Sequence, residues 1–138
     1  MKMKAATLYE PKGKFVFEEV ELQEPKADEV LVKIVASGIC HTDAAVRDQF
    51  IPVPLPAVLG HEGAGIVEKV GSNVTSLKPG DHVVLSFSSC GYCENCLTGH
   101  PNNCEKLNDF NFGGIMNDGT KRIRKGETEF SAFFGQSS

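Results

Sequence analysis

The sequence predicts a mainly β (α+β) fold, in which short strands form a small twisted barrel with one or two short helices. Fourteen glycines and seven prolines are spread along the 138 residues, which indicates frequent turns and short elements. Segments rich in β-branched residues recur between these turns. A chain of this length supports one domain with a sizeable core.

The first part of the chain is predicted to consist of strands divided by turns. Lys4–Tyr9 and Lys14–Val20 flank Glu10-Pro11-Lys12-Gly13, which is a plausible hairpin connection. Glu29–Val35 alternates in part and is β-branched, so it predicts a strand with one half-solvated face, ended by Gly38.

A short helix is predicted next. Thr42 or Asp43 is the expected N-cap, and the helix should end near Gln49, because the proline-rich segment 51–56 forbids further helix. Two more strands are predicted over Ala64–Val70 and His82–Phe87.

After Glu105 the composition changes. Residues 108–114 and 117–126 are rich in Asn, Asp, Gly and charge, so they predict a long surface loop. The basic run Lys121–Lys125 could bind an anion, but a solvated loop face is favoured because acidic residues lie on both sides of it. Three phenylalanines in 130–138 predict a strand that belongs to something larger.

The charge and hydrophobicity of the chain exclude several kinds of partner. A formal net charge of −4 argues against a nucleic-acid or anionic-membrane partner. The lysines in Met1–Thr7 are followed by no apolar segment, so no signal peptide is expected, and no stretch reaches the roughly 20 apolar residues of a membrane span. We therefore expect a cytoplasmic protein.

The strongest motif is a cluster of four of the five cysteines, at residues 90–104, which we call the four-cysteine lobe. Two overlapping Cys-x-x-Cys steps join Cys90, Cys93 and Cys96, and Cys104 follows eight residues later. Zinc takes four tetrahedral ligands, and a site with four thiolates leaves no position for water. The lobe is therefore predicted to bind a structural zinc ion.

Two other chemistries could use such a cluster. Disulfides are disfavoured in a reducing cytoplasm. Iron–sulfur motifs usually place a proline after the last cysteine, whereas Glu105 follows Cys104. Structural zinc is favoured over both, and its binding should be coupled to ordering of the lobe, which is too short and polar for an apolar core.

The fifth cysteine, Cys40, follows the strand predicted over Glu29–Val35, and His61 lies 21 residues after it, before the strand predicted over Ala64–Val70. A lone cysteine or histidine is more often an ordinary core residue. Together they place a thiolate, an imidazole and carboxylates at strand ends. A zinc site with mixed ligands and an open position is one interpretation of this arrangement.

These motifs resemble the zinc-dependent, medium-chain alcohol dehydrogenases. Gly60-His61-Glu62-x-x-Gly65, with Gly71 and Val74 after it, is similar to the family signature, and Gly38-Ile39-Cys40-His41-Thr42-Asp43 and the four-cysteine lobe match it in order and spacing. The resemblance implies that residues 1–138 are the GroES-like catalytic domain, with the lobe at 90–104 inside it. The segments 46–49 and 52–56 and the phenylalanine-rich end are similar to the aryl- and benzyl-alcohol dehydrogenase branch.

The resemblance also implies roles for individual residues. Cys40 and His61 would be ligands of a catalytic zinc ion, and Glu62 would lie behind the zinc or ligate it when substrate is absent. Thr42 would take the proton of the alcohol, and Asp43 would orient His61. His41 would face the pyrophosphate of the nicotinamide cofactor, NAD or NADP.

Two features of the family pattern are missing. The family's catalytic zinc has a further cysteine ligand beyond the lobe, but all five cysteines here are already assigned. The Gly-x-Gly-x-x-Gly unit of a Rossmann domain is also absent from these 138 residues. We therefore expect an N-terminal fragment of the enzyme that is inactive alone.

The function expected of the full-length parent is hydride transfer between NAD(P) and primary alcohols or aldehydes, aromatic or allylic ones in particular. The parent is expected to be a homo-oligomer. Ser86 and four phenylalanines are candidates for the pocket wall: Phe50, Phe87, Phe110 and Phe112. The alternative is a non-catalytic zinc scaffold or interaction module derived from the same fold.

Overall fold

The computed structural model describes residues 1–134 and residue 136, and short strands dominate them. A five-stranded sheet has the order β4-β1-β2-β7-β8, and a three-stranded sheet has the order β3-β5-β6. The strands are Lys2–Leu8 (β1), Val16–Leu22 (β2), Val30–Ser37 (β3), Ala57–Val58 (β4), Gly63–Val70 (β5), His82–Val84 (β6), Ile123–Lys125 (β7) and Thr128–Phe130 (β8). The helices are His41–Arg47 (α1), Glu94–Leu97 (α2) and Leu107–Phe112 (α3), with a 3₁₀ turn at Pro101–Asn103.

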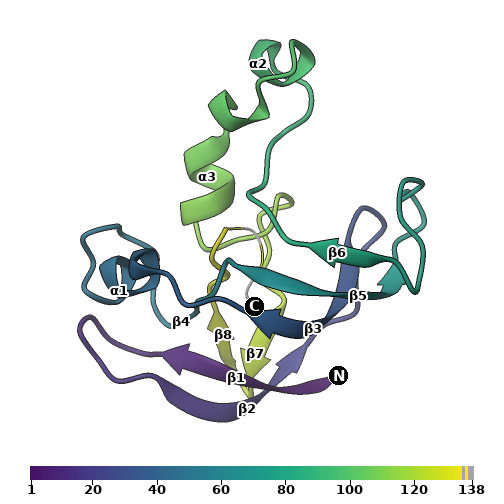
Figure 1. Ribbon diagram of the computed structural model, residues 1–138. Helices are drawn as coiled ribbons and strands as arrows, with labels where there is room; N and C mark the ends of the chain where they lie inside the picture. The colour runs from purple at the N-terminus through teal and green to yellow at the C-terminus, as the bar shows by residue number, and fades with distance from the viewer. Residues whose placement is uncertain (135, 137–138) are drawn as a thin grey trace.

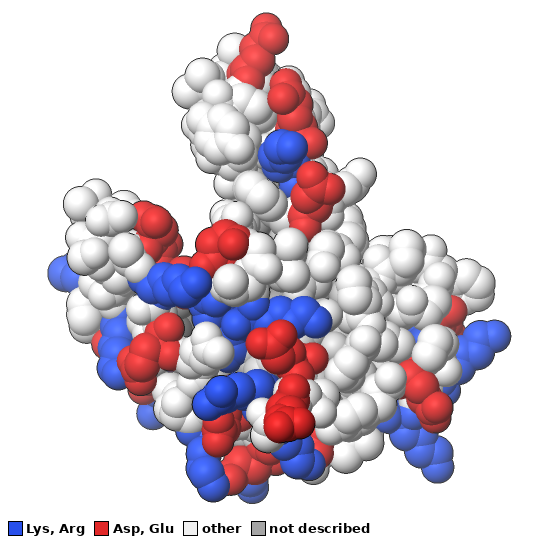
Figure 2. All heavy atoms as spheres, turned by 180° about the vertical axis from the view of Figure 1, so that it is seen from behind, with Lys and Arg blue, Asp and Glu red and all other residues white. Residues whose placement is uncertain are grey.

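The two sheets form a barrel-like body, and the four-cysteine lobe projects from it (Figure 1). Helix α3 lies between the lobe and the sheets, while α1 lies at the side of the body beside β4 (Figure 1). On the face seen in Figure 2, basic and acidic side chains are intermixed over the body. The predicted mainly β, barrel-like fold with short helices and a small lobe is confirmed.

The predicted first hairpin is present. Strands β1 and β2 pair antiparallel from Lys2↔Glu21 to Thr7↔Val16. Leu8 follows this pairing and is 0% exposed, because it packs in the main apolar cluster. In β2, Val20 is buried, and the glutamates on either side of it, Glu19 and Glu21, are exposed.

Helix α1 begins earlier than predicted, because its N-cap is Cys40 and not Thr42 or Asp43. The Cys40 thiol accepts from the Thr42 amide at 3.5 Å, while the Asp43 carboxylate accepts from the Cys40 amide at 3.3 Å. This reciprocal capping box fixes the junction between β3 and α1. Val46, 0% exposed, then anchors the helix to the apolar cluster.

The predicted surface loop at 108–114 and 117–126 is wrong at its two ends, while residues 113–122 do lie outside the helices and strands. Residues Leu107–Phe112 form α3, and Ile123–Lys125 pairs with Thr128–Phe130 as a hairpin. Hydrophobic periodicity cannot reveal either element, because α3 has six residues and each strand of the hairpin has three. The strand predicted over His82–Phe87 is also shorter than expected and ends at Val84.

The basic run Lys121–Lys125 is not a solvated loop face. Arg122 is 7% exposed, and its guanidinium bonds both oxygens of Glu29, with Nη2–Oε1 at 2.5 Å and Nε–Oε2 at 2.9 Å. Nη2 also reaches Asp118 at 2.8 Å. Burial opposes ionisation of Glu29, but hydrogen bonds from Arg122 and from the Lys26 amide outweigh it and lower the pKa of Glu29.

The phenylalanines near the end of the chain belong to the interior. Phe130 ends β8, and Phe130 and Phe133 are both 0% exposed. Ala57 and Ser131 form a parallel bridge, which brings this segment to β4. The rest of the strand predicted over 130–138 includes Gly135, Ser137 and Ser138, which lie outside the described residues. Among the residues described, no helix is long and apolar enough to cross a membrane.

Candidate metal centres

The four-cysteine lobe brings its four thiols to one point. The ligand atoms of Cys90, Cys93, Cys96 and Cys104 all lie within 4.8 Å of one another. The Cys96 sulfur is 3.5 Å from that of Cys93 and 3.9 Å from that of Cys90. Zinc–sulfur bonds of about 2.3 Å in a tetrahedron require sulfurs about 3.8 Å apart, so this donor set fits zinc.

Backbone amides surround these sulfurs. The Cys104 sulfur accepts from the amides of Cys90 and Lys106, each at 3.3 Å, and the Cys90 sulfur accepts from the Cys93 amide at 3.3 Å. Such donors stabilise thiolates, the form that binds a metal. All five cysteines of the chain are free thiols, so no disulfide competes for the four.

The protonation of the lobe is uneven. The Glu105 amide, followed by the Cys96 amide, lowers the pKa of Cys93 to about 6. Burial raises the pKa of Cys96 to about 11. The Cys90 amide lowers the pKa of Cys104. Cys93 and Cys104 therefore lose their protons more readily than Cys96, and zinc binding would displace the protons that remain.

A second group of metal-binding side chains forms where β3, α1 and β5 meet. The ligand atoms of Cys40, His61 and Glu62 lie within 4.8 Å of one another. Cys40 caps α1, and His61 and Glu62 directly precede β5. Cys40 and His61 are partly buried and Glu62 is exposed, so the group is open on the carboxylate side. Thiolate, imidazole and carboxylate together are a zinc-binding donor set.

One carboxylate ties the two protein ligands of this group together. The Asp43 Oδ1 lies 3.3 Å from Nδ1 of His61 and accepts from the Gly60 amide at 3.2 Å, while Oδ2 accepts from the Cys40 amide. This bond directs Nδ1 of the imidazole away from the group and leaves Nε2 for a metal. The side chains of His61 and Asp43 are 12% and 13% exposed, so this bond is well shielded from solvent.

Glycine at position 38 leaves room for the third member of the group. A Cβ at Gly38 would lie 2.0 Å from Oε2 of Glu62, well inside van der Waals contact. The Gly38 amide also donates to the Glu62 carbonyl at 3.0 Å. A side chain at position 38 would therefore displace the Glu62 carboxylate from its place beside Cys40 and His61.

Two phenylalanines that the sequence did not single out for the site form a wall around His61. The Phe134 ring stacks on the imidazole at 4.9 Å with planes 20° apart, and the Phe133 ring meets it edge-on at 5.1 Å. The sequence gives no sign of these contacts, because Phe133 and Phe134 follow His61 by more than seventy residues.

The phenylalanines predicted to line the pocket differ in burial and in their distance from the site. Phe112 packs against this wall, with its ring 5.3 Å from that of Phe134. Phe87 and Phe110 are partly buried, and Phe50 is 79% exposed. The Thr42 hydroxyl lies 3.2 Å from the Cys40 sulfur, within the site. His41, the first residue of α1, is exposed to solvent.

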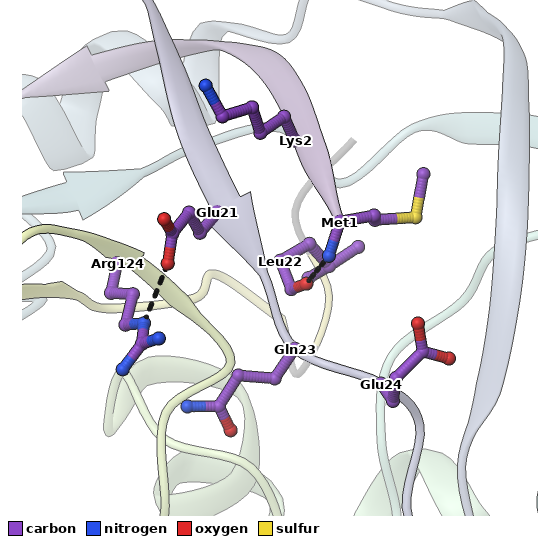
Figure 3. Close-up of a pocket in the computed structure, with 7 residues that line it drawn as sticks. All are labelled: Met1, Lys2, Glu21, Leu22, Gln23, Glu24 and Arg124. Carbon is purple, nitrogen blue, oxygen red and sulfur yellow. Dashed lines mark hydrogen bonds and ion pairs between the residues drawn. The ribbon is translucent and has the colours of Figure 1, made fainter.

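Two hollows lie away from this group. A groove of about 1240 Å³ between the two sheets is lined by apolar side chains such as Leu31, Val83 and Met116, and Ser86 also contributes to it. A smaller hollow of about 280 Å³ lies at the amino terminus, where the Met1 amine donates to the Leu22 carbonyl and Arg124 pairs with Glu21 (Figure 3). Among the described residues, neither lining includes Cys40, His61 or Glu62.

Comparison with known proteins identifies the family. The profile of the alcohol dehydrogenase GroES-like domain matches residues 26–127. The chain belongs to this family. The matched range contains both groups of metal-binding side chains.

Individual relatives of this GroES-like domain are dehydrogenases. Geraniol dehydrogenase of Castellaniella defragrans is 54% identical over 136 residues, which are 97% of this chain and 36% of the relative. NDMA-dependent alcohol dehydrogenase of Amycolatopsis methanolica is 46% identical over 133 residues, 96% of this chain and 36% of the relative. The chain thus spans about a third of the length of these relatives.

Solved structures agree with the fold. A zinc-binding domain protein of the alcohol dehydrogenase type from Burkholderia ambifaria superposes with a TM-score of 0.96 at 47% identity, over 100% of this chain and 38% of that one. Benzyl alcohol dehydrogenase from Acinetobacter calcoaceticus superposes with a TM-score of 0.89 at 46% identity, over 99% of this chain and 36% of that one.

Proposed function

We propose that this chain is the GroES-like part of a zinc- and NAD(P)-dependent alcohol dehydrogenase that interconverts primary alcohols and aldehydes. The observation that carries the proposal is the convergence of Cys40, His61 and Glu62, with Asp43 bonded to the first two. A scaffold would need neither the open side of this group nor the orienting carboxylate. The lobe supplies the second, closed site, which we propose is structural.

The residues of this chain divide the work as follows. Zinc bound at Cys40 and His61 would supply Lewis-acid chemistry that lowers the pKa of an alcohol hydroxyl, and the nicotinamide would accept hydride. The Thr42 hydroxyl, 3.2 Å from the Cys40 sulfur, would take the proton of the alcohol while its own proton passes to water or to the cofactor ribose. Asp43 keeps the His61 imidazole in one tautomer.

Two further roles belong to side chains at the edge of the site. Glu62 would help to hold the metal as a ligand or lie close to it, and the absence of a side chain at Gly38 leaves room for its carboxylate. His41 is exposed beside Cys40 and is proposed to face the pyrophosphate of NAD or NADP. A homo-oligomeric state is a prediction for the full-length parent.

The proposed substrates are aromatic or allylic primary alcohols. Support comes from two relatives, which are named for geraniol and for benzyl alcohol. In both compounds the carbon that bears the hydroxyl is attached to an sp² carbon. The partly buried ring of Phe134, which stacks on His61, offers an apolar, flat surface next to the site, which suits such groups.

Metal content and activity together test the proposal. The 138-residue chain should bind two zinc equivalents, one in each group of side chains, and should show no benzyl alcohol oxidation by itself. The full-length protein that contains it should oxidise benzyl alcohol with NAD or NADP, and a chelator or Cys40→Ala should abolish this activity. Undiminished activity in Cys40→Ala would sink the zinc mechanism. A single zinc equivalent, lost in Cys93→Ser, would favour the scaffold instead.

A further inference from the structure

Asn111 is a buried polar residue whose side-chain oxygen and both side-chain N–H groups are hydrogen-bonded. It lies in α3 and is 1% exposed. Its Oδ1 accepts from the Ser88 amide at 2.8 Å, and its Nδ2 donates to the carbonyls of Ser88 at 2.9 Å and Leu107 at 2.6 Å. Two donors and one acceptor of a single amide are thus all used by backbone groups.

These partners lie at the two ends of the four-cysteine lobe. Ser88 comes two residues before Cys90, and Leu107 comes three residues after Cys104. The Leu107 amide donates in turn to the Cys104 carbonyl at 3.0 Å. The Asn111 side chain therefore closes the neck of the lobe by joining the segment that enters it, at Ser88, to the helix that leaves it.

The backbone of the same residue reaches the other site. The Asn111 carbonyl accepts from the Phe134 amide at 2.8 Å. Phe134 is the residue whose ring stacks on His61 at 4.9 Å. A continuous path of bonded groups therefore runs from both ends of the lobe, through Asn111, to the ring that covers the imidazole.

We propose that Asn111 is a positioning residue that makes the stacking of Phe134 on His61 depend on metal binding in the four-cysteine lobe. The inference rests on the proposed function, because it takes the lobe as a metal site. The lobe exposes its larger apolar side chains, Tyr92 and Leu97, at 67% and 74%. With no apolar core, the lobe depends on its metal for the shape of its neck, and hence for the position of α3.

If Asn111 only closed the lobe, its substitution would disturb Ser88 and Leu107 but leave His61 unaffected. If it also positions Phe134, its substitution should change the nuclear magnetic resonance signals of His61. Protons that lie over the face of an aromatic ring are shifted upfield, so the His61 ring signals report the position of Phe134 directly. This readout needs neither activity nor the rest of the enzyme.

The experiment uses the 138-residue chain carrying Cys40→Ser, which disables the other metal site, with cadmium as the probe. Cadmium prefers thiolates to imidazole and carboxylate, so one equivalent should fill the lobe. Thiolate–cadmium charge-transfer absorbance measures that binding, and proton–carbon spectra of the His61 ring follow the second site. The same titration is repeated with Asn111→Leu, and with Asn111→Asp in case the first variant does not fold.

Asn108→Leu is the matched control, because it makes the same change at an exposed position of α3. We expect cadmium to move the His61 ring signals upfield in the parent and in Asn108→Leu. In Asn111→Leu or Asn111→Asp cadmium should still bind, but the shift of His61 should be lost. An equal shift in these variants, or bound cadmium with no shift in the parent, would overturn the inference. Failure of cadmium to bind the lobe at all would instead count against the proposed function.

Discussion

The four-cysteine lobe and the Cys40–His61 group are both candidate zinc sites, but they are built in opposite ways. The lobe takes all four ligands from fifteen consecutive residues and projects from the body (Figure 1). The Cys40–His61 group joins the end of a strand, the cap of a helix and the start of another strand, and aromatic rings pack against its histidine. A local site depends on its metal for order, whereas a site assembled by the fold can be held in place before any metal binds.

The largest expected effect is loss of the lobe. Cys93→Ser should remove one zinc equivalent and expose the amides of residues 90–104 to hydrogen exchange, because we expect a bound metal to supply most of the order there. The amides of β1 and β2 should keep their protection. Exchange rates residue by residue, together with metal analysis, check this. If β1 and β2 lost protection as well, the lobe would not be an independent unit.

A change near the Cys40–His61 group should lower the metal affinity of that group and leave the lobe unaffected. Asp43→Asn weakens the bond that orients His61, and loss of such a partner lowers metal affinity by about 10–100-fold. Competition with a chromophoric chelator measures the affinity of each site. Asp48→Asn is a suitable control on the neighbouring turn, since its carboxylate pairs with Arg47 and not with His61. Affinity of the lobe should be unchanged in both variants.

A smaller effect is expected at Gly38. Gly38→Ala would place a methyl group 2.0 Å from the Glu62 Oε2, so the carboxylate must move away from Cys40 and His61. Metal affinity of this group should fall to the level of Glu62→Ala. The double variant should then be no weaker than either single one, which is the non-additivity expected of residues in contact. Additive losses would show that Gly38 acts by another route.

The smallest effect concerns the body that carries both sites. Hydrogen bonds from Lys125, Thr7 and Tyr9 lower the pKa of Glu18 from 4.5 to about 2. Because the folded-state pKa is depressed, the contribution of Glu18 to stability is present above pH 4.5 and is lost as the pH falls toward 2. Urea unfolding at several pH values should show a weaker acid dependence for Glu18→Gln. If the stability of Glu18→Gln depended on pH just as that of the parent does, Glu18 would not contribute to the acid dependence.

The same contrast explains what the sequence could predict. The lobe is local, so its four ligands follow from spacing alone. Cys40 and His61 needed the resemblance to a family, because each is unremarkable alone. Other contacts could not be predicted from the sequence. The Arg122–Glu29 pair spans 93 residues, and the Asn111 clamp on Ser88 spans 23, so neither leaves a local pattern. The missed helix α3 and hairpin β7–β8 are held by such long-range contacts and by buried apolar residues such as Phe130, and they are too short for hydrophobic periodicity to reveal them.

The carboxylate of Asp43 has a mechanical consequence. One oxygen is bonded to the Cys40 amide, and the other is bonded to the Gly60 amide and the His61 ring. A single planar carboxylate therefore links the start of α1 to the segment that precedes β5. Any displacement of α1 is therefore transmitted to His61 as well as to Cys40. The two ligands should translate together and keep their separation, so that the fold can shift this site as a unit without widening it.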